Sequence, residues 1–180
     1  MSAAVPGNTV IRAARPEDID ALIELAATTF HDTYCTMDDP ADIAIYVTTN
    51  FTRRAFADIL ADASMTLSVA VSGGRLVGYL QTRRSKPPPC VSGPAPIELA
   101  RLYLRQEAIG TGLGAALMRE MHAQARGQGC ETSWLVVYRR NDQARDFYRR
   151  WDFAEVGVKD FQFGGKVYSD PVMSAPVREV

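Results

Sequence analysis

Three glycines alternate with other residues where a predicted strand gives way to a predicted helix. They are Gly110, Gly112 and Gly114, between the segments 97–104 and 113–128. Glycine lets backbone N–H groups approach an anion closely, and the N-terminus of a helix adds a favourable dipole. The pattern predicts a site for a phosphate-bearing ligand, although helix-entry turns also use glycine for steric reasons alone.

Two other kinds of phosphate loop fit the sequence poorly. A P-loop ends in Gly-Lys-Ser/Thr, which the chain does not contain. The dinucleotide fingerprint G-x-G-x-x-G opens the first strand–helix–strand unit, whereas these glycines are spaced G-x-G-x-G and lie past the middle of the chain. A nucleotide-binding oxidoreductase therefore stays as an alternative that the spacing disfavours.

A second cluster of chemically useful residues begins at Asn141, which opens a short predicted helix. Its apolar face carries Ala144, Phe147, Tyr148 and Trp151. The phenol of Tyr148 could donate a proton to a leaving group. The same side chain could instead pack in the core, where its hydroxyl would need a partner if buried.

Together these two segments resemble the GNAT superfamily of acyl-CoA-dependent N-acetyltransferases. The glycine turn corresponds to that family's pyrophosphate loop, Q/R-x-x-G-x-G/A, and N-x-x-A-x-x-F-Y corresponds to its later motif on the CoA side. The resemblance implies a single α/β (α+β) domain over residues 9–177, with helices on both faces of a mixed central sheet of about six or seven strands. It also implies acetyl-CoA as the co-substrate, with no metal.

The resemblance assigns the cofactor-binding residues as well. The backbone of 102–104 would pair with the pantetheine arm like an added strand, and N–H groups of 109–114 would hold the pyrophosphate. Asn141 would bond the cofactor near its pantetheine portion, and Ala144 would leave room for it. The full expected set is Leu102, Tyr103, Leu104, Ile109, Gly110, Thr111, Gly112, Leu113, Gly114, Asn141, Ala144 and Tyr148.

Two residues receive catalytic roles from the resemblance. Tyr148 would protonate the departing CoA thiolate, while a backbone N–H near Leu104 polarises the thioester carbonyl. Glu98, on the strand that enters the glycine turn, would take a proton from the ammonium acceptor through water. Glu98 could equally be an exposed strand carboxylate or a partner for Arg101.

The chain departs from the family pattern at three positions. Ile109 stands where Gln or Arg precedes the glycines, so a side-chain contact near the phosphates is lost while the backbone donor remains. Gln106 replaces a usual proline, and Asp152 replaces the glycine before the motif's final Phe. Because of Ile109, a non-catalytic acyl-CoA-binding or regulatory module stays open.

The expected acceptor is a primary amine of a small cationic molecule. Residues 1–70 carry ten acids against four bases, whereas the remainder has an excess of bases. Segments 29–34, 39–51 and 161–173 resemble the PaiA-type spermidine/spermine acetyltransferase branch. The resemblance implies a polyamine as the acceptor, with Phe30, Asp32 and Tyr34 as the expected acceptor-binding residues. Peptide N-termini, lysines and aminoglycosides remain alternatives, and a homodimer is an expectation because GNAT domains often dimerise.

Composition excludes several other classes of protein. The chain has 180 residues and a net charge of −1, which suits one globular domain and argues against a nucleic-acid partner. No apolar run is long enough for a membrane span, and the first residues carry no secretory pattern, so a cytoplasmic location is expected. Cys35, Cys90 and Cys130 are too scattered to predict a disulfide or a zinc site.

Hydrophobic periodicity and turn residues predict alternating strands and helices. A helix is expected to begin at Pro16, with others from 40, at 53–61, at 113–128 and from 141. Strands are expected at 10–13, 66–71, 75–82, 97–104, 132–137, 153–163 and 167–173, the last two joined at Gly164-Gly165.

Overall fold

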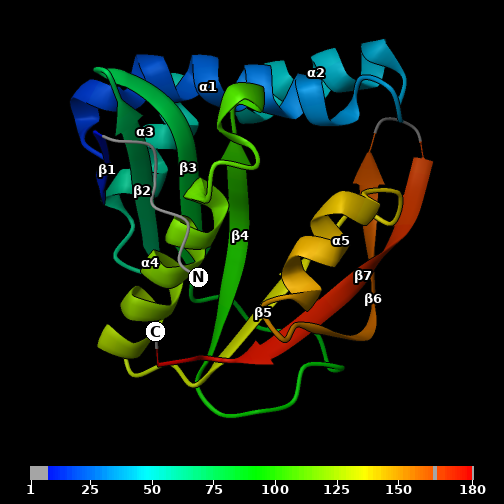
Figure 1. Ribbon diagram of the computed structural model, residues 1–180. Coiled ribbons are helices and arrows are strands. Elements are labelled where there is room, and N and C mark those ends of the chain that lie inside the picture. The colour runs from blue at the N-terminus through cyan, green and yellow to red at the C-terminus, as the bar shows by residue number, and fades with distance from the viewer. Residues whose placement is uncertain (1–7, 164–165, 180) are drawn as a thin grey trace.

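A single mixed sheet of seven strands runs through the protein, whose computed structural model describes residues 8–163 and 166–179 (Figure 1). The order is β1-β2-β3-β4-β5-β7-β6. The strands are β1 Thr9–Ala13, β2 Met65–Ser72, β3 Arg75–Arg83, β4 Pro96–Leu104, β5 Thr132–Val136, β6 Ala154–Phe163 and β7 Lys166–Pro176. The helices are α1 Ile19–Tyr34, α2 Pro40–Asn50, α3 Arg53–Ala61, α4 Leu113–Gly127 and α5 Asp142–Arg149.

Local capping explains where the first helices begin. The predicted helix at Pro16 is wrong by three residues: a 3₁₀ turn occupies Pro16–Asp18, and α1 starts at Ile19. The reason is Asp18, whose carboxylate accepts a 2.8 Å hydrogen bond from the Arg15 amide and is held by both guanidinium nitrogens of Arg12. The Arg12 guanidinium lowers the pKa of Asp18, so this turn is fixed by charge as well as by Pro16.

Two hydrophobic clusters cover the two faces of the sheet. On one face α4 and α5 pack against the centre of the sheet through residues such as Leu117, Met121 and Phe153. On the other, α1, α2 and α3 enclose an aromatic-rich cluster that includes Phe30, Phe51 and Phe56. Helices therefore cover both faces of a mixed sheet, as predicted; the Gly164-Gly165 turn lies outside the described residues.

The sheet is split at its centre. All neighbouring strands are antiparallel except β4 and β5, which run parallel and pair at three positions, the last being Glu98 with Trp134. Beyond Glu98, β4 continues to Leu104 along β3 while β5 diverges from it (Figure 1). A register shift between Gln81 and Thr82 leaves Ala100 as an extra residue on β4, a bulge that bends the strand where the split begins.

Within the described residues, no helix combines the length and apolarity that crossing a bilayer requires. The longest, α1, has 16 residues and buries one face against the sheet.

His122 gives the fold a dependence on pH. It is fully buried on α4, where Nδ1 accepts a 3.2 Å hydrogen bond from the Arg178 amide and the ring lies 5.6 Å from Trp151. Burial, followed by the charges of Arg178 and Arg126, lowers the pKa of His122 to about 4. An unfolded histidine titrates near ~6.5, so the folded state disfavours protonation of this residue.

We expect the free energy of unfolding to fall on acidification because unfolding lets His122 take up a proton. The stabilisation is complete above pH ~6.5 and is lost as the pH falls towards 4, amounting to about 2 kcal/mol between pH 7.5 and pH 5. Urea denaturation of the wild type and of His122→Gln at both pH values measures this difference. His31→Gln, which changes the exposed histidine, should keep the wild-type dependence. An unchanged pH slope in His122→Gln would refute the assignment.

Candidate active site

The open edge of β4 lies where an extended ligand could be held. After Glu98, the side of β4 that faces β5 has no strand partner among the described residues. The predicted pantetheine-binding residues Leu102, Tyr103 and Leu104 all lie on this stretch. An unpaired strand edge offers a row of N–H and C=O groups that can bond to amide groups of a ligand.

The glycine turn leads from this edge into α4. Gly110 and Gly112 have φ of 80° and 87°, a left-handed conformation that glycine adopts without strain. Among the described residues no side chain caps α4 at Gly112, and the first amides of the helix have no partner there. An added Cβ at Gly110 would meet nothing within 4 Å. The residues present therefore fit a phosphate group: an uncapped helix start with open space before it.

Two of the predicted phosphate-binding positions have other bonds. The amide of Ile109 donates to the Gln106 carbonyl at 3.1 Å, and it closes the short 3₁₀ turn Gln106–Ala108. Ile109 is therefore not the free backbone donor that the sequence predicts, because the 3₁₀ turn consumes its N–H. The Thr111 hydroxyl donates to the Ala108 carbonyl at 2.8 Å, which fixes the turn.

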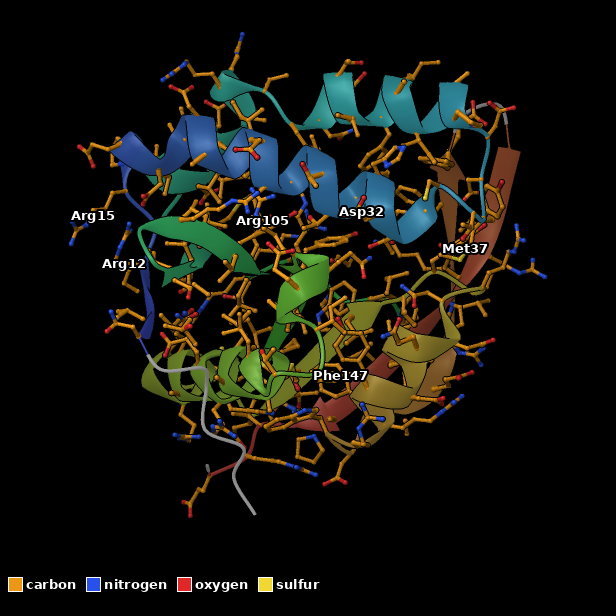
Figure 2. The ribbon with its side chains drawn as sticks, turned by 45° about the horizontal axis from the view of Figure 1, so that its top comes forward. Arg12, Arg15, Asp32, Met37, Arg105 and Phe147 are labelled. Carbon is orange, nitrogen blue, oxygen red and sulfur yellow. The ribbon has the colours of Figure 1, made fainter. Side chains whose placement is uncertain are left out.

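Gly114 has a steric role in addition. A Cβ at this position would lie 3.3 Å from the ring of Phe147 on α5, a side chain labelled in Figure 2. The absence of a side chain thus lets α5 approach the first turn of α4, beside Leu104. Gly114 and Phe147 bring the two motifs of the sequence together.

Helix α5 carries Asn141, Ala144 and Tyr148 to this place. The Asn141 Oδ1 atom accepts a 3.0 Å hydrogen bond from the Ala144 amide, so this side chain caps α5 and only its amide nitrogen remains for a ligand. Tyr148 is 9% exposed and packs against Phe153. Its hydroxyl has no hydrogen-bond partner among the described residues, and the oxygen atom keeps some solvent-accessible surface. Burial raises the pKa of Tyr148 well above its ordinary value, which keeps the phenol protonated.

A pocket of about 360 Å³, here called the central pocket, lies between α1–α2, the split of the sheet and the β6–β7 ribbon. Ala100 and Val136 line it from the two sides of the split. Its charged residues are Asp38, Arg83, Glu98, Arg101, Lys159, Asp160 and Asp170, and its aromatic residues are Phe30, Tyr34, Tyr46, Tyr103, Tyr138, Phe161, Phe163 and Tyr168.

The predicted acceptor residues divide between the pocket and the surface. Phe30 and Tyr34 line the central pocket, but Asp32 does not. Asp32 lies on another side of α1 with a third of its side chain exposed, 3.6 Å from His31 Nδ1 (Figure 2). The structure brings Asp38 to the pocket instead, because the chain turns back after α1 with the Asp38 amide bonded to the Tyr34 carbonyl at 3.0 Å.

Asp38 also ties the two halves of the split sheet together. Its Oδ1 accepts hydrogen bonds from the hydroxyls of Tyr138, at 3.0 Å, and Tyr168, at 3.2 Å. Nearby, the Arg140 guanidinium donates to the carbonyl of Met37, which Figure 2 places at the end of α1. Burial and then the bond to Asp38 raise the pKa of Tyr138 to about 12. The turn after α1 therefore closes over the end of the cleft between β4 and β5.

Glu98 is buried and strongly bonded. Arg83 reaches both of its oxygens, at 2.6 and 2.9 Å, and Ser85 donates a third hydrogen bond. The two alternatives that the sequence left open for Glu98, an exposed carboxylate or a partner for Arg101, are both wrong, since Glu98 is buried and β3 supplies Arg83 as its partner. Nothing in the sequence pattern around residue 83 indicated this bond, because it depends on the register between β3 and β4.

Comparisons with known proteins identify the family of this chain. Residues 19–153 match the model of the acetyltransferase (GNAT) family. An uncharacterized N-acetyltransferase from Mycobacterium tuberculosis is 34% identical over 163 residues, which are 91% of this chain and 98% of that protein. The chain belongs to the GNAT family and is an acetyl-CoA-dependent N-acetyltransferase.

Solved structures show the same fold. The crystal structure of the PaiA N-acetyltransferase from Thermoplasma acidophilum in complex with coenzyme A has a TM-score of 0.76 at 21% identity, covering 94% of this chain and 99% of that one. The ribosomal-protein-alanine N-acetyltransferase from Brucella melitensis has a TM-score of 0.69 at 21% identity, covering 93% and 99%. At this identity the likeness establishes the fold alone.

The glycine turn gives a matched pair of substitutions. Gly110 and Gly129 both have positive φ, 80° and 71°, and an added Cβ at either meets nothing within 4 Å. Alanine at either position should cost about 1 kcal/mol of stability through the same backbone strain. Only Gly110→Ala places a methyl group in front of α4, so we expect it to raise the Kd for CoA at least tenfold. Calorimetric titration measures this, and equal affinities in the two variants would contradict phosphate binding at the turn.

Proposed function

We propose that this enzyme acetylates a primary amine of a small-molecule acceptor by direct attack on acetyl-CoA in a ternary complex. The observation that carries the proposal is that the β4 edge, the glycine turn and the central pocket lie next to one another. The free β4 edge and glycine turn lie at one side of the split, the central pocket lies at the other, and Ala100 and Val136 line the pocket where the two meet. A cofactor on the β4 edge would present its thioester to an amine in this pocket. The PaiA N-acetyltransferase, which has a similar fold, was solved in complex with coenzyme A, and this supports coenzyme A as the cofactor.

Tyr148 is the proposed general acid. The amine nitrogen attacks the thioester carbonyl, the C–S bond breaks, and the leaving thiolate takes the phenolic proton. The phenol is protonated at neutral pH and reaches open space without a competing hydrogen-bond partner among the described residues. Both properties suit a proton donor.

Two carboxyl groups of the central pocket are candidates to receive the proton of the ammonium, through water. Glu98 would have to accept it while bonded to Arg83 and Ser85. Among the described residues Asp170 accepts one hydrogen bond, from the Arg139 amide at 3.1 Å. Burial raises the pKa of Asp170, the amide and the charge of Arg139 oppose this, and nearby Asp38 adds to it. Because Glu98 is held in an ion pair with Arg83 whereas Asp170 has no ion pair among the described residues, we favour Asp170 as the proton acceptor and keep Glu98 as the alternative.

A cationic acceptor suits the end of the pocket that holds Asp38 and Asp170. Neither carboxylate has an ion pair with a side chain among the described residues, so an ammonium could approach both. Polyamines, amino acids and lysine side chains all carry such a group, and the polyamine expectation rests on this feature. The enclosure of the pocket by the turn at Met37 favours a small molecule over a folded protein surface.

Ile109 is the departure that left a non-catalytic acyl-CoA-binding module open in the sequence, and membership in the N-acetyltransferase family argues against that interpretation. The Ile109 side chain is 42% exposed at the glycine turn and offers no polar contact to a phosphate. Against this, the uncapped amides at the start of α4 and the open Tyr148 hydroxyl are both present.

We expect acetylation of at least one amine in a panel of spermidine, a lysine peptide, an aminoglycoside and free amino acids, detected by mass. Tyr148→Phe should lower kcat at least tenfold with little change in the Kd for CoA, because the variant loses only the proton donor. Tyr79→Phe removes another buried phenol, one that does not line the pocket although it lies near Arg101, and it should lower kcat less than Tyr148→Phe does. CoA binding without turnover on any amine of the panel would contradict the proposed small-molecule acceptor.

A further inference from the structure

Arg101 faces the central pocket with no charged partner. Among the described residues its guanidinium makes no hydrogen bond and no ion pair, and it lies over the ring of Phe51 at 5.2 Å. Its Nη1 atom is sealed from solvent and unpaired. The other guanidinium nitrogens keep some accessible surface, and Arg101 lines the central pocket.

Such an arrangement is costly without a ligand. A buried donor that lacks an acceptor destabilises the folded protein, and more so when the donor is charged. Two neutral neighbours also lack hydrogen-bond partners among the described residues. Gln81, opposite Arg101 on β3, has an unpaired buried Oε1, and Tyr79 has an unpaired buried hydroxyl. Neither of these groups is an anion that could neutralise the guanidinium.

The other cations of the pocket do not have this character. Arg83 is neutralised by Glu98 through two hydrogen bonds. Lys159 is exposed and lies 5.8 Å over the ring of Trp134. Arg101 is therefore the partly buried cation of the pocket that lacks a carboxylate partner within the described residues.

The pocket thus has a guanidinium at one end and two carboxylates at the other, and none of the three groups has an ion pair with a side chain among the described residues. One end has Arg101, on β4, and the other has Asp38 and Asp170, which are bonded to tyrosine hydroxyls and to a backbone amide. An acceptor with an ammonium alone would satisfy only the second end. A ligand that carries both an ammonium and a carboxylate would satisfy both, and a planar carboxylate matches the guanidinium geometry.

We infer that the acceptor of this acetyltransferase is an amino acid or a related amino-carboxylate, with its carboxylate bound by Arg101 and its ammonium directed to Asp38 and Asp170. This inference rests on the proposed function and narrows its substrate class. It makes Arg101 a specificity residue, because a diamine of the same length would leave the guanidinium unpaired.

The test compares acceptors that differ by one carboxylate. Lysine is paired with cadaverine, ornithine with putrescine, and β-alanine with ethylamine, so that three separations between amine and carboxylate are sampled. We expect kcat/KM for at least one amino-carboxylate to exceed that of its decarboxylated partner at least tenfold. In Arg101→Gln this preference should fall below threefold, while Arg101→Lys, which keeps the charge, should retain part of it.

Arg75→Gln is the matched control, since Arg75 begins β3 outside the pocket and pairs with Glu107 at the surface. It should keep the wild-type preference. Equal rates within every wild-type pair, or a preference that survives Arg101→Gln, would overturn the inference and leave the acetyltransferase proposal standing.

Calorimetric binding of the same pairs to the protein with CoA separates the two failures, because it requires no turnover. Tighter binding of an amino-carboxylate that Arg101→Gln abolishes, without acetylation of any amine, would support the inferred ligand class and contradict the proposed function. Absence of both binding and turnover for all amino-carboxylates would contradict the inference.

Discussion

The pairing of β4 with β5 at three positions, and their divergence after Glu98, is the constraint on which the rest of the structure depends. Two parallel strands in full register would bury the β4 edge and leave no space between them. The bulge at Ala100 bends β4 away at the point where pairing ends. The split creates at once a free strand edge for an extended cofactor and a cavity for an acceptor, and it brings the two into contact.

Because β4 and β5 separate, other contacts must hold the two halves of the sheet together. Side chains from segments far apart in the sequence make these contacts. Asp38 joins the turn after α1 to Tyr138 after β5 and to Tyr168 on β7. Phe147 on α5 packs against Gly114 at the start of α4. These contacts lie on opposite faces of the sheet, so the two halves are held together at both sides of the cleft while the cleft itself stays open.

Whether a feature of this structure could be predicted from the sequence depends on how far apart along the chain the interacting residues lie. The bounds of α3, Arg53–Ala61, were predicted correctly because Thr52 caps the helix locally, accepting a bond from the Ala55 amide. The family motifs correctly predicted the fold class, and Asp152, at φ of 62°, adopts a conformation that explains the usual glycine there. The Arg83–Glu98 pair and the inward turn of Asp38 were missed because they depend on strand register and on a loop, which no local pattern encodes.

The two halves of the site also differ in how the chain specifies them. Backbone groups and glycines build the cofactor side, so a short motif describes it and a departure such as Ile109 leaves the free amides of α4 in place. Side chains from α1, β3, β4, β5, β6 and β7 build the acceptor side, and their charges meet only after folding. A single substitution such as Arg101→Gln would change the charge of the acceptor side without touching the motif. For this reason the sequence motifs predict acetyl transfer. The choice of amine depends instead on charged side chains of the acceptor pocket, which the split sheet brings together only after folding.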